Sequence, residues 1–553
     1  MLTVDAKVFY SEGALPVLSM FKKHIFYNAG ILSGFLVLLS LAYWPAISMR
    51  YVYHDSLVFF LDTDVRFLPP GTIFSFITGR YLGAVFLAVI GRLVSQVSDL
   101  EILRFLSIVQ LSVCGLLLTN FLRKNFLKPL ESFFVVFILL TLPAFQITVC
   151  QGGMAFYPMS ILMILLSFIL AFDAPDKKSI WTYCSLPVLG SVFLMIVSLC
   201  IYQSGAMFFW ALTAAVILFS QKETFLDLQN KIGRIFFVGL LSMAIYRLIL
   251  ELNKKLYLSY TSRQDYSPYL LTNQVLAKIK WFLTDPVVKV LNFWNIIPTK
   301  GYALCFVFFV AGGIFLALLH AKRKDILLEA LKKGIIKALI LSGLFFLTSL
   351  PNLLFPENIS FYRCYMALSA FCVFLSFWVL LQYKNFFLSL GRVARAVILC
   401  LLVGFGLFQA YQTTWRFRAQ PSAEELDFLQ ETLQSVNLNQ FSRVYLIQPN
   451  QARLYTSDDE YGNLTTSFGN DIIGFFSCGI IGLMKNSYQI YHIDYDPVSG
   501  KTIYFFKRQG EDTPEYSYRV ILSFGFEPKT QADFAEPTLI IDMNRVVDKI
   551  VKK

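Results

Sequence analysis

Long apolar stretches recur along the chain and constrain its fold more than any other feature. A helix needs about 20 apolar residues to cross the roughly 30 Å hydrocarbon core of a bilayer. Hydrophobic residues make up 56% of the chain and charged residues only 15%, which exceeds what the core of a soluble domain requires. The sequence therefore predicts an all-α polytopic membrane bundle of about eleven transmembrane helices. The predicted spans are residues 26–47, 102–121, 132–150, 155–172, 184–201, 204–220, 234–252, 302–320, 336–354, 363–381 and 394–411.

Basic clusters between these stretches predict their orientation. Short loops rich in Lys and Arg, such as residues 322–324, belong in the cytoplasm by the positive-inside rule. The clusters alternate sides correctly if segment 81–94, only about 21 Å long as a helix, does not cross the bilayer. We therefore expect a cytoplasmic N-terminus and one exterior loop over 48–101 that contains an interfacial helix. The basic exterior segment 253–300 conflicts with the rule, which long loops follow less strictly.

The end of the chain has a different character. From Thr413 onward the sequence is polar and holds no apolar run long enough to span a membrane. We predict a transmembrane domain over 1–411 and a small extracytoplasmic α/β domain over 412–553. Its expected elements are a helix from Ser422 to about Ser435 and strands at 443–448, 488–493, 502–507 and 538–542.

Charge and cysteine content exclude several classes of protein. The net charge of +12 is carried by basic runs that flank apolar segments, as membrane topology requires, so no nucleic-acid partner is predicted. Most of the nine cysteines lie in or beside apolar segments, so no disulfide framework is implied. The four histidines show no ligand spacing, which argues against a zinc site.

Acidic residues cluster in the first exterior loop. Asp55 follows His54 close to the end of the first span, between the apolar residues Tyr53 and Leu57. It is our candidate general base, because a short tether to a helix end controls its position. Asp62 and Asp64 follow. They match the acidic tripeptide with which many glycosyltransferases hold a divalent cation, but no further carboxylate ligand can be placed. We expect no metal or other cofactor and assign His54, Asp62 and Asp64 to sugar or acceptor binding.

Exterior arginines are candidates for phosphate binding. Arg80 begins the expected interfacial helix, Arg263 lies in YLSYTSRQDYSPY (257–269), and Arg363 stands where a span begins. Guanidinium groups bind phosphate bidentately and stay charged at a membrane interface. Each of these positions is also suited to a structural anchor whose charge reaches the lipid headgroups.

Further polar side chains lie in short exterior turns. Tyr202 and Gln203 occupy one such turn, and Gln151 lies on the same side of the membrane in CQGGMAFYP (150–158). A Gln can hydrogen-bond a sugar hydroxyl and a Tyr can stack on its ring, although a turn needs polar residues in any case. With Tyr81, they complete the predicted sugar- or acceptor-binding set.

Four motifs carry a resemblance to a known family: YHDSLVFF (53–60), TGRYLG (78–83), SLCIYQSG (198–205) and YRCYMALSAF (362–371). Together with the order of spans and loops, they resemble the GT-C superfamily of integral membrane glycosyltransferases, and most closely its Gtr-type O-antigen glucosyltransferases of bacteria and phages. Such enzymes show paired acidic residues in the first loop, whereas His54 precedes Asp55 here, which leaves Asp55 as the single matching acid.

This resemblance implies a function and a location. It implies transfer of a hexose, glucose in the closest family, from a polyprenyl-phosphate donor to a surface polysaccharide such as the O-antigen of lipopolysaccharide. The expected site is the periplasmic face of a bacterial inner membrane, with Asp55 as base in an inverting displacement. A transporter or flippase of a lipid-linked saccharide is the alternative from another class. It predicts ionisable residues in the middle of several spans, broken helices and repeated halves, and the sequence shows little of any of these. Aminoarabinose, mannosyl and oligosaccharyl transferases of the GT-C type are alternatives within the enzymes.

Overall fold

The structure is a computed structural model of the chain. It describes residues 14–51, 75, 78–94, 99–175, 185–220, 225–257, 274–295, 300–323, 327–354, 358, 361–387, 392–420, several positions between 423 and 440, 443–447, 488–496, 501–508, 518–525, 530–534 and 537–542.

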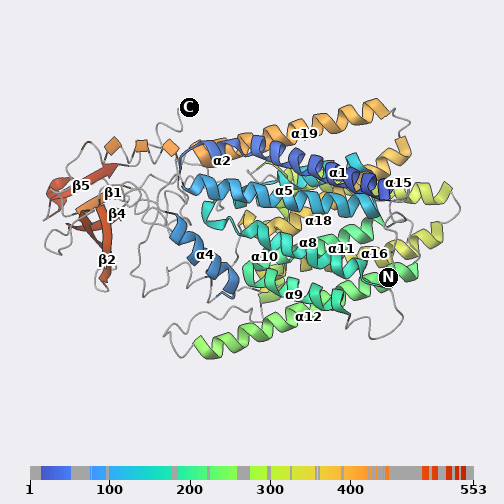
Figure 1. Cartoon of the computed structure of the whole chain (residues 1–553), viewed down its shortest axis with the longest axis horizontal. Helices are drawn as coiled ribbons and strands as arrows, with labels where there is room; N and C mark the ends of the chain where they lie inside the picture. The colour runs from blue at the N-terminus through green and yellow to red at the C-terminus, as the bar shows by residue number, and fades with distance from the viewer. Residues whose placement is uncertain are drawn as a thin grey trace, which may run out of the picture.

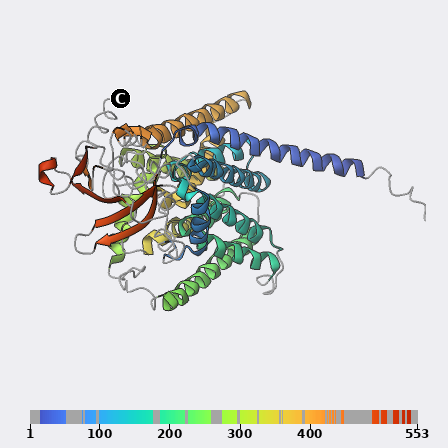
Figure 2. The same cartoon turned by 60° about the vertical axis from the view of Figure 1, so that its left-hand side comes forward.

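Within these ranges, a helix lies at every position where a membrane span was predicted (Figure 1). The longest helices run side by side, as Figures 1 and 2 both show. The helices at the positions of the predicted spans are α1 (Ala14–Ala42), α5 (Asp99–Asn125), α6 (Pro129–Leu140), α7 (Pro143–Cys150), α8 (Tyr157–Asp173), α9 (Leu186–Ile201), α10 (Gln203–Ala206), α11 (Phe208–Phe219), α12 (Phe225–Tyr257), α15 (Lys300–Arg323), α16 (Leu327–Leu347), α18 (Met366–Phe387) and α19 (Arg392–Thr414).

Several of these helices are long and apolar enough to cross a membrane. Five described segments meet this test by length and composition, and the bent pair α6–α7 makes six if it counts as one span. The other predicted spans correspond to shorter apolar helices. The fold is therefore predominantly helical with membrane-spanning character, and the number of eleven spans stays a prediction. The five segments are Asp99–Asn125, Gln229–Asn253, Lys300–Leu319, Tyr362–Tyr383 and Val397–Thr414.

Shorter helices lie between the long ones. Segment 81–94 forms α4 (Tyr81–Leu93), as predicted, and its 13 residues are too few to span a bilayer. The basic segment 253–300 contains α13 (Val275–Thr284) and α14 (Pro286–Leu291). Two further short helices are α2 (Trp44–Ser48) and α17 (Leu350–Leu354). The position of α4 at the membrane surface stays a prediction.

The strands come from the end of the chain and form one mixed sheet at one end of the helical bundle (Figure 1). All four predicted strands are present, and β4 was missed. The strand order is β2-β3-β4-β1-β5, in which β1 runs parallel to β4 and β5 while β3 is antiparallel to β2 and β4. Leu539 and Ile541 of β5 belong to the same cluster of buried residues as the helices. The boundary at 411/412 stays a prediction. The strands are β1 (Arg443–Ile447), β2 (Tyr488–Asp496), β3 (Lys501–Arg508), β4 (Tyr518–Gly525) and β5 (Thr538–Asp542).

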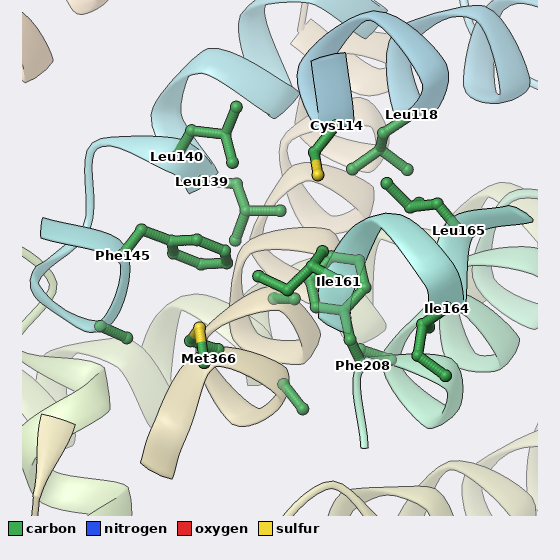
Figure 3. Packing of buried hydrophobic residues seen from close by; sticks show 14 of the residues in the cluster. Cys114, Leu118, Leu139, Leu140, Phe145, Ile161, Ile164, Leu165, Phe208 and Met366 are labelled. Carbon is green, nitrogen blue, oxygen red and sulfur yellow. The ribbon is translucent and has the colours of Figure 1, made fainter. Parts of the chain in front are cut away.

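Aliphatic and aromatic side chains fill the centre of the bundle. Figure 3 shows Leu118 of α5, Leu139 of α6, Leu165 of α8 and Phe208 of α11 facing one another. Because lipid tails are as apolar as these side chains, close van der Waals packing is what favours helix association in a membrane. Small residues permit this packing: a Cβ on Gly239 of α12 would lie 2.5 Å from the buried ring of Trp210.

Two consecutive apolar helices, α6 and α7, are sharply bent against each other in the bundle interior. The axes of α6 and α7 differ by 62° across a break that precedes Pro143, which cannot donate a backbone hydrogen bond. Side chains satisfy the carbonyls at this break: the Tyr43 hydroxyl donates to Leu140 O, and Gln146 Nε2 donates to Thr141 O at 2.7 Å. Apolar surroundings demand such partners, because an unsatisfied carbonyl there costs several kcal/mol.

Replacement of Tyr43 tests this explanation of the break. We expect Tyr43→Phe to lower the free energy of unfolding by about 1–3 kcal/mol, because it leaves Leu140 O buried without a donor. Tyr383→Phe is the matched control, since its hydroxyl donates to Phe309 O inside the continuous helix α15. Thermal unfolding in detergent micelles measures both, and an equal or larger loss in the control would contradict the explanation.

Candidate functional site

Predicted site residues come together where five elements meet. Arg80 lies at the start of α4, Gln151 follows α7, Tyr202 and Gln203 join α9 to α10, and Arg363 lies in the short helix η5 (Tyr362–Tyr365). Tyr81 is the first residue of α4, and its hydroxyl shares a hydrogen bond with Asn253 of α12. The other predicted site residues lie outside the described part of the chain: His54, Asp55, Asp62, Asp64 and Arg263.

The backbone before α4 fixes the position of Arg80. Gly79 has φ +85°, a conformation that other L residues adopt only at an energetic cost. A Cβ there would also lie 2.5 Å from the Tyr246 hydroxyl. Gly83, one turn later, lets α4 approach α9 so closely that a Cβ would lie 2.8 Å from Ile201 O. At both glycine positions of the TGRYLG motif, a side chain would therefore clash with neighbouring atoms.

The Arg80 guanidinium is held by neutral side chains. Its Nε donates to Gln203 Oε1 at 3.2 Å and its Nη1 donates to Tyr157 OH at 3.3 Å. Its central carbon lies 5.1 Å from the centre of the Tyr202 ring, a cation–π contact. Among the described residues, no carboxylate lies within ion-pair distance of this side chain. A partly buried positive charge is thus fixed in place without an anionic partner in the described part of the chain.

The side-chain amide of Gln203 is hydrogen-bonded within the protein at both its nitrogen and its oxygen. Its Nε2 donates to Thr78 O and to Tyr246 OH, each at 2.7 Å, and Tyr246 OH donates to Gly79 O at 3.1 Å. Both amide hydrogens are therefore engaged by protein groups, and the amide oxygen accepts from Arg80. Gln203 holds the start of α4 and orients Arg80, which is a positioning role.

Tyr202 supports the same guanidinium from inside the bundle. It is fully buried, and its ring stacks on Tyr157 with 3.8 Å between ring centres. Its hydroxyl lies 3.6 Å from Cys364 Sγ in η5. This stack leaves little room for a sugar ring on Tyr202. Sequence reasoning missed Tyr157, although it lies in the quoted stretch CQGGMAFYP, because its partners are 77 and 45 residues away.

A second arginine and an amide lie beside this group. Arg363 Nη1 lies 3.6 Å from Met154 Sδ, and its guanidinium lies 4.8 Å from the centre of the Phe361 ring. It is close enough to Arg80 for the two charges to interact. Met154 ends the 3-10 helix η2 (Gly152–Met154), which Gln151 precedes. Gln151 is fully buried, and neither amide atom has a hydrogen-bond partner among the described residues.

Tyr51, the last described residue before segment 52–74, is bound to the backbone next to Gln151. Tyr51, four residues before Asp55, donates its hydroxyl to the carbonyl of Cys150 at 3.0 Å. Tyr51 is fully buried. Sequence reasoning did not select this residue, because an aromatic residue near the end of a span is usually a membrane-interface anchor.

The site thus offers guanidinium charge, a buried amide that has no hydrogen-bond partner in the described ranges, and a supporting stack of phenols. This set suits a ligand that carries both phosphate and hydroxyl groups. No group of three or more His, Cys, Asp or Glu residues suited to a metal ion occurs in the described ranges, and Asp62 and Asp64 lie outside them. In comparisons with known proteins, the chain matches no family model, and no curated relative is found for it.

Gly79 tests how the backbone positions Arg80. We expect Gly79→Ala to destabilise the protein by at least about 1–2 kcal/mol, because the left-handed conformation disfavours a side chain and the new Cβ meets Tyr246. Gly404→Ala in α19 is the control, since a Cβ there meets nothing within 4 Å. It should stabilise the helix by up to about 1 kcal/mol. Thermal unfolding in detergent measures the midpoint of both variants. An equal shift of the two midpoints would refute the explanation.

Proposed function

We propose that this chain is a GT-C-type membrane glycosyltransferase that moves a hexose, glucose in the first instance, from a polyprenyl-phosphate donor to a surface polysaccharide. The observation that carries the proposal is the Arg80 group: a guanidinium fixed by Gln203, Tyr157 and Tyr202 without a carboxylate among the described residues. A fixed cation of this kind at the start of an apolar helix suits the phosphate of a lipid whose tail lies along the bundle.

Phosphate binding would serve both affinity and rate. When the bond between the anomeric carbon and the phosphate oxygen breaks, negative charge grows on the departing polyprenyl phosphate. Arg80 is already oriented by its protein partners, so little reorganisation is needed as that charge develops. Arg363 adds a second positive charge nearby, and Arg263 is the third candidate from the sequence. Arginine suits this task because it stays protonated and binds phosphate with two parallel hydrogen bonds.

Asp55 is the proposed general base. An acceptor hydroxyl oxygen would attack the anomeric carbon, the donor's phosphate oxygen would leave with the bonding electrons, and the hydroxyl proton would pass to the Asp55 carboxylate. This single displacement inverts the anomeric configuration. Support comes from Tyr51, which is anchored at Cys150 beside Gln151. Four residues of chain reach at most about 14 Å, so the tether is short.

Gln151 is the proposed contact to a sugar hydroxyl. A buried amide without partners costs about 1–3 kcal/mol for each unsatisfied group, so such a group is expected to have a role in binding. A sugar hydroxyl both donates and accepts, which matches an amide whose oxygen and nitrogen have no partner in the part of the chain that the structure describes. His54, Tyr81, Asp62 and Asp64 remain further candidates for this part of the site.

The proposed location is a bacterial inner membrane, with the N-terminus in the cytoplasm and the sheet in the periplasm. The sheet and α4 lie toward the same end of the bundle (Figure 1), which agrees with a shared exterior side. There the sheet would cover the site and help to select the polysaccharide acceptor. The reaction as proposed requires no metal ion or other cofactor.

A transporter or flippase of a lipid-linked saccharide is the second candidate. One observation favours it: the broken pair α6–α7, since interrupted helices commonly surround transporter binding sites. Aminoarabinose, mannosyl and oligosaccharyl transferases would use the same phosphate site with another sugar.

Asp55 tests the reaction. We expect Asp55→Asn to lower the rate of sugar transfer by about 10²–10⁴-fold, the usual contribution of a general base. The exposed residue Asp427 provides the control, and Asp427→Asn should transfer at the wild-type rate. The assay follows transfer from a panel of radiolabelled polyprenyl-phosphate hexoses to lipopolysaccharide in proteoliposomes. Full transfer by Asp55→Asn would remove this residue from the mechanism, and lipid flipping without transfer would favour the transporter.

Arg80 tests the donor site. We expect Arg80→Lys to lower kcat/KM for the donor by about 10–200-fold, because lysine keeps the charge but loses the bidentate geometry, a loss of about 1.4–3 kcal/mol. Arg247→Lys is the matched control on α12, where the side chain is exposed and pairs with Glu251. An Arg80 variant as active as that control would contradict phosphate binding at this position.

A further inference from the structure

Another arginine, Arg104, lies in the bundle outside the proposed donor site. Arg104 of α5 is fully buried. Its Nη1 donates to Ala46 O at 3.2 Å and to Met49 O at 3.5 Å, and its Nη2 donates to Tyr51 O at 2.5 Å. The central guanidinium carbon lies 3.6 Å from the centre of the Tyr51 ring.

These contacts lie where the chain leaves α2. The carbonyls at the end of a helix have no partner within the helix and carry partial negative charge, which a cation stabilises. A planar guanidinium can bridge several such carbonyls at once, which an ammonium group cannot do with the same geometry. Because Arg104 comes from another helix, it specifies how the backbone turns from helical residues into the extended residue Met49.

Tyr51 is consequently held from several sides. Arg104 covers its ring and binds its carbonyl, while its hydroxyl donates to Cys150 O. Ala419 and Ala423, which follow α19, pack against it in a separate small cluster. Tyr51 is therefore fixed to α5, to the end of α7 and to the segment that leads toward the sheet.

We propose that Arg104 is a positioning residue for the transfer reaction, acting through Tyr51 to fix the point from which the segment with Asp55 begins. The inference rests on the proposed function, because it requires Asp55 to be the base. Arg104 touches neither substrate nor base. Its effect is geometric: when a reacting group is displaced by about 1 Å, the rate can fall about 10²-fold while binding is retained.

Arg234 is a matched control for Arg104, because it also binds backbone carbonyls but lies away from the proposed site. Arg234 of α12 is also buried, and it donates to Ala171 O at 2.7 Å, Phe172 O at 3.1 Å and Pro175 O at 3.4 Å at the end of α8. The 17 residues of α8 place that end about 25 Å from Tyr157, which touches Arg80. Arg234 thus binds carbonyls at a helix end in the same way, far from the proposed site.

The experiment compares Arg104→Lys with Arg234→Lys in the full chain. Three quantities are measured for each: the thermal midpoint, the steady-state kcat and donor KM, and hydrogen–deuterium exchange of peptides over residues 44–51 and 168–175. We expect both variants to lose similar stability. Only Arg104→Lys should lower kcat, by about 10–100-fold, with donor KM changed less than about 3-fold and faster exchange confined to residues 44–51.

Two results would overturn the positioning role. One is a similar fall of kcat in both variants, which would mark a general loss of stability as the cause. The other is wild-type kcat in Arg104→Lys despite faster exchange at residues 44–51. Failure of the proposed function looks different, because the wild-type protein itself would then transfer no sugar from any donor of the panel.

Discussion

Backbone carbonyls at interrupted helices must find donors inside the protein, because apolar surroundings supply no water. This constraint recurs at several places in the described bundle. Tyr43 and Gln146 satisfy the carbonyls between α6 and α7, Arg104 those after α2, and Arg234 those at the end of α8. Each donor comes from a different element than most of its acceptors, so meeting the constraint also fixes how those elements are placed.

The arrangement around Arg80 follows from the same constraint. The backbone is irregular before α4, and its carbonyls at Thr78 and Gly79 accept from Gln203 and Tyr246. The side chains that satisfy this irregular backbone are those that orient the guanidinium. The same side chains therefore satisfy the backbone carbonyls and orient the Arg80 guanidinium. In this way rigid elements give a binding group a precise geometry.

Sequence reasoning predicted the parts of the fold that depend on mean polarity. Apolar runs predicted the helices. Short segments rich in β-branched and aromatic residues predicted β1, β2, β3 and β5. β4 was missed, although it is a central strand that pairs with β1 on one side and β3 on the other. Hydropathy reports how apolar a segment is, but not which distant group it meets.

The same limit explains what was predicted of the site. Arg80, Gln151 and Arg363 could be selected because charged and polar side chains are rare near apolar spans. The positioning role of Gln203, the stack on Tyr157 and the contacts of Arg104 depend on partners 45 to 125 residues away. Such pairings are set by how helices pack, which local spacing does not encode. The catalytic assignment of Asp55 stays a prediction, because this residue lies outside the described ranges.

The contacts of Gln203 have a mechanical consequence. This one amide joins the residues before α4 to α10 and, through Tyr246, to α12, while Gly83 seats α4 directly on the backbone of α9. Independent sliding of α4 would break all of these contacts together. Any displacement of α4 would therefore carry α9, α10 and α12 with it as a single rigid body.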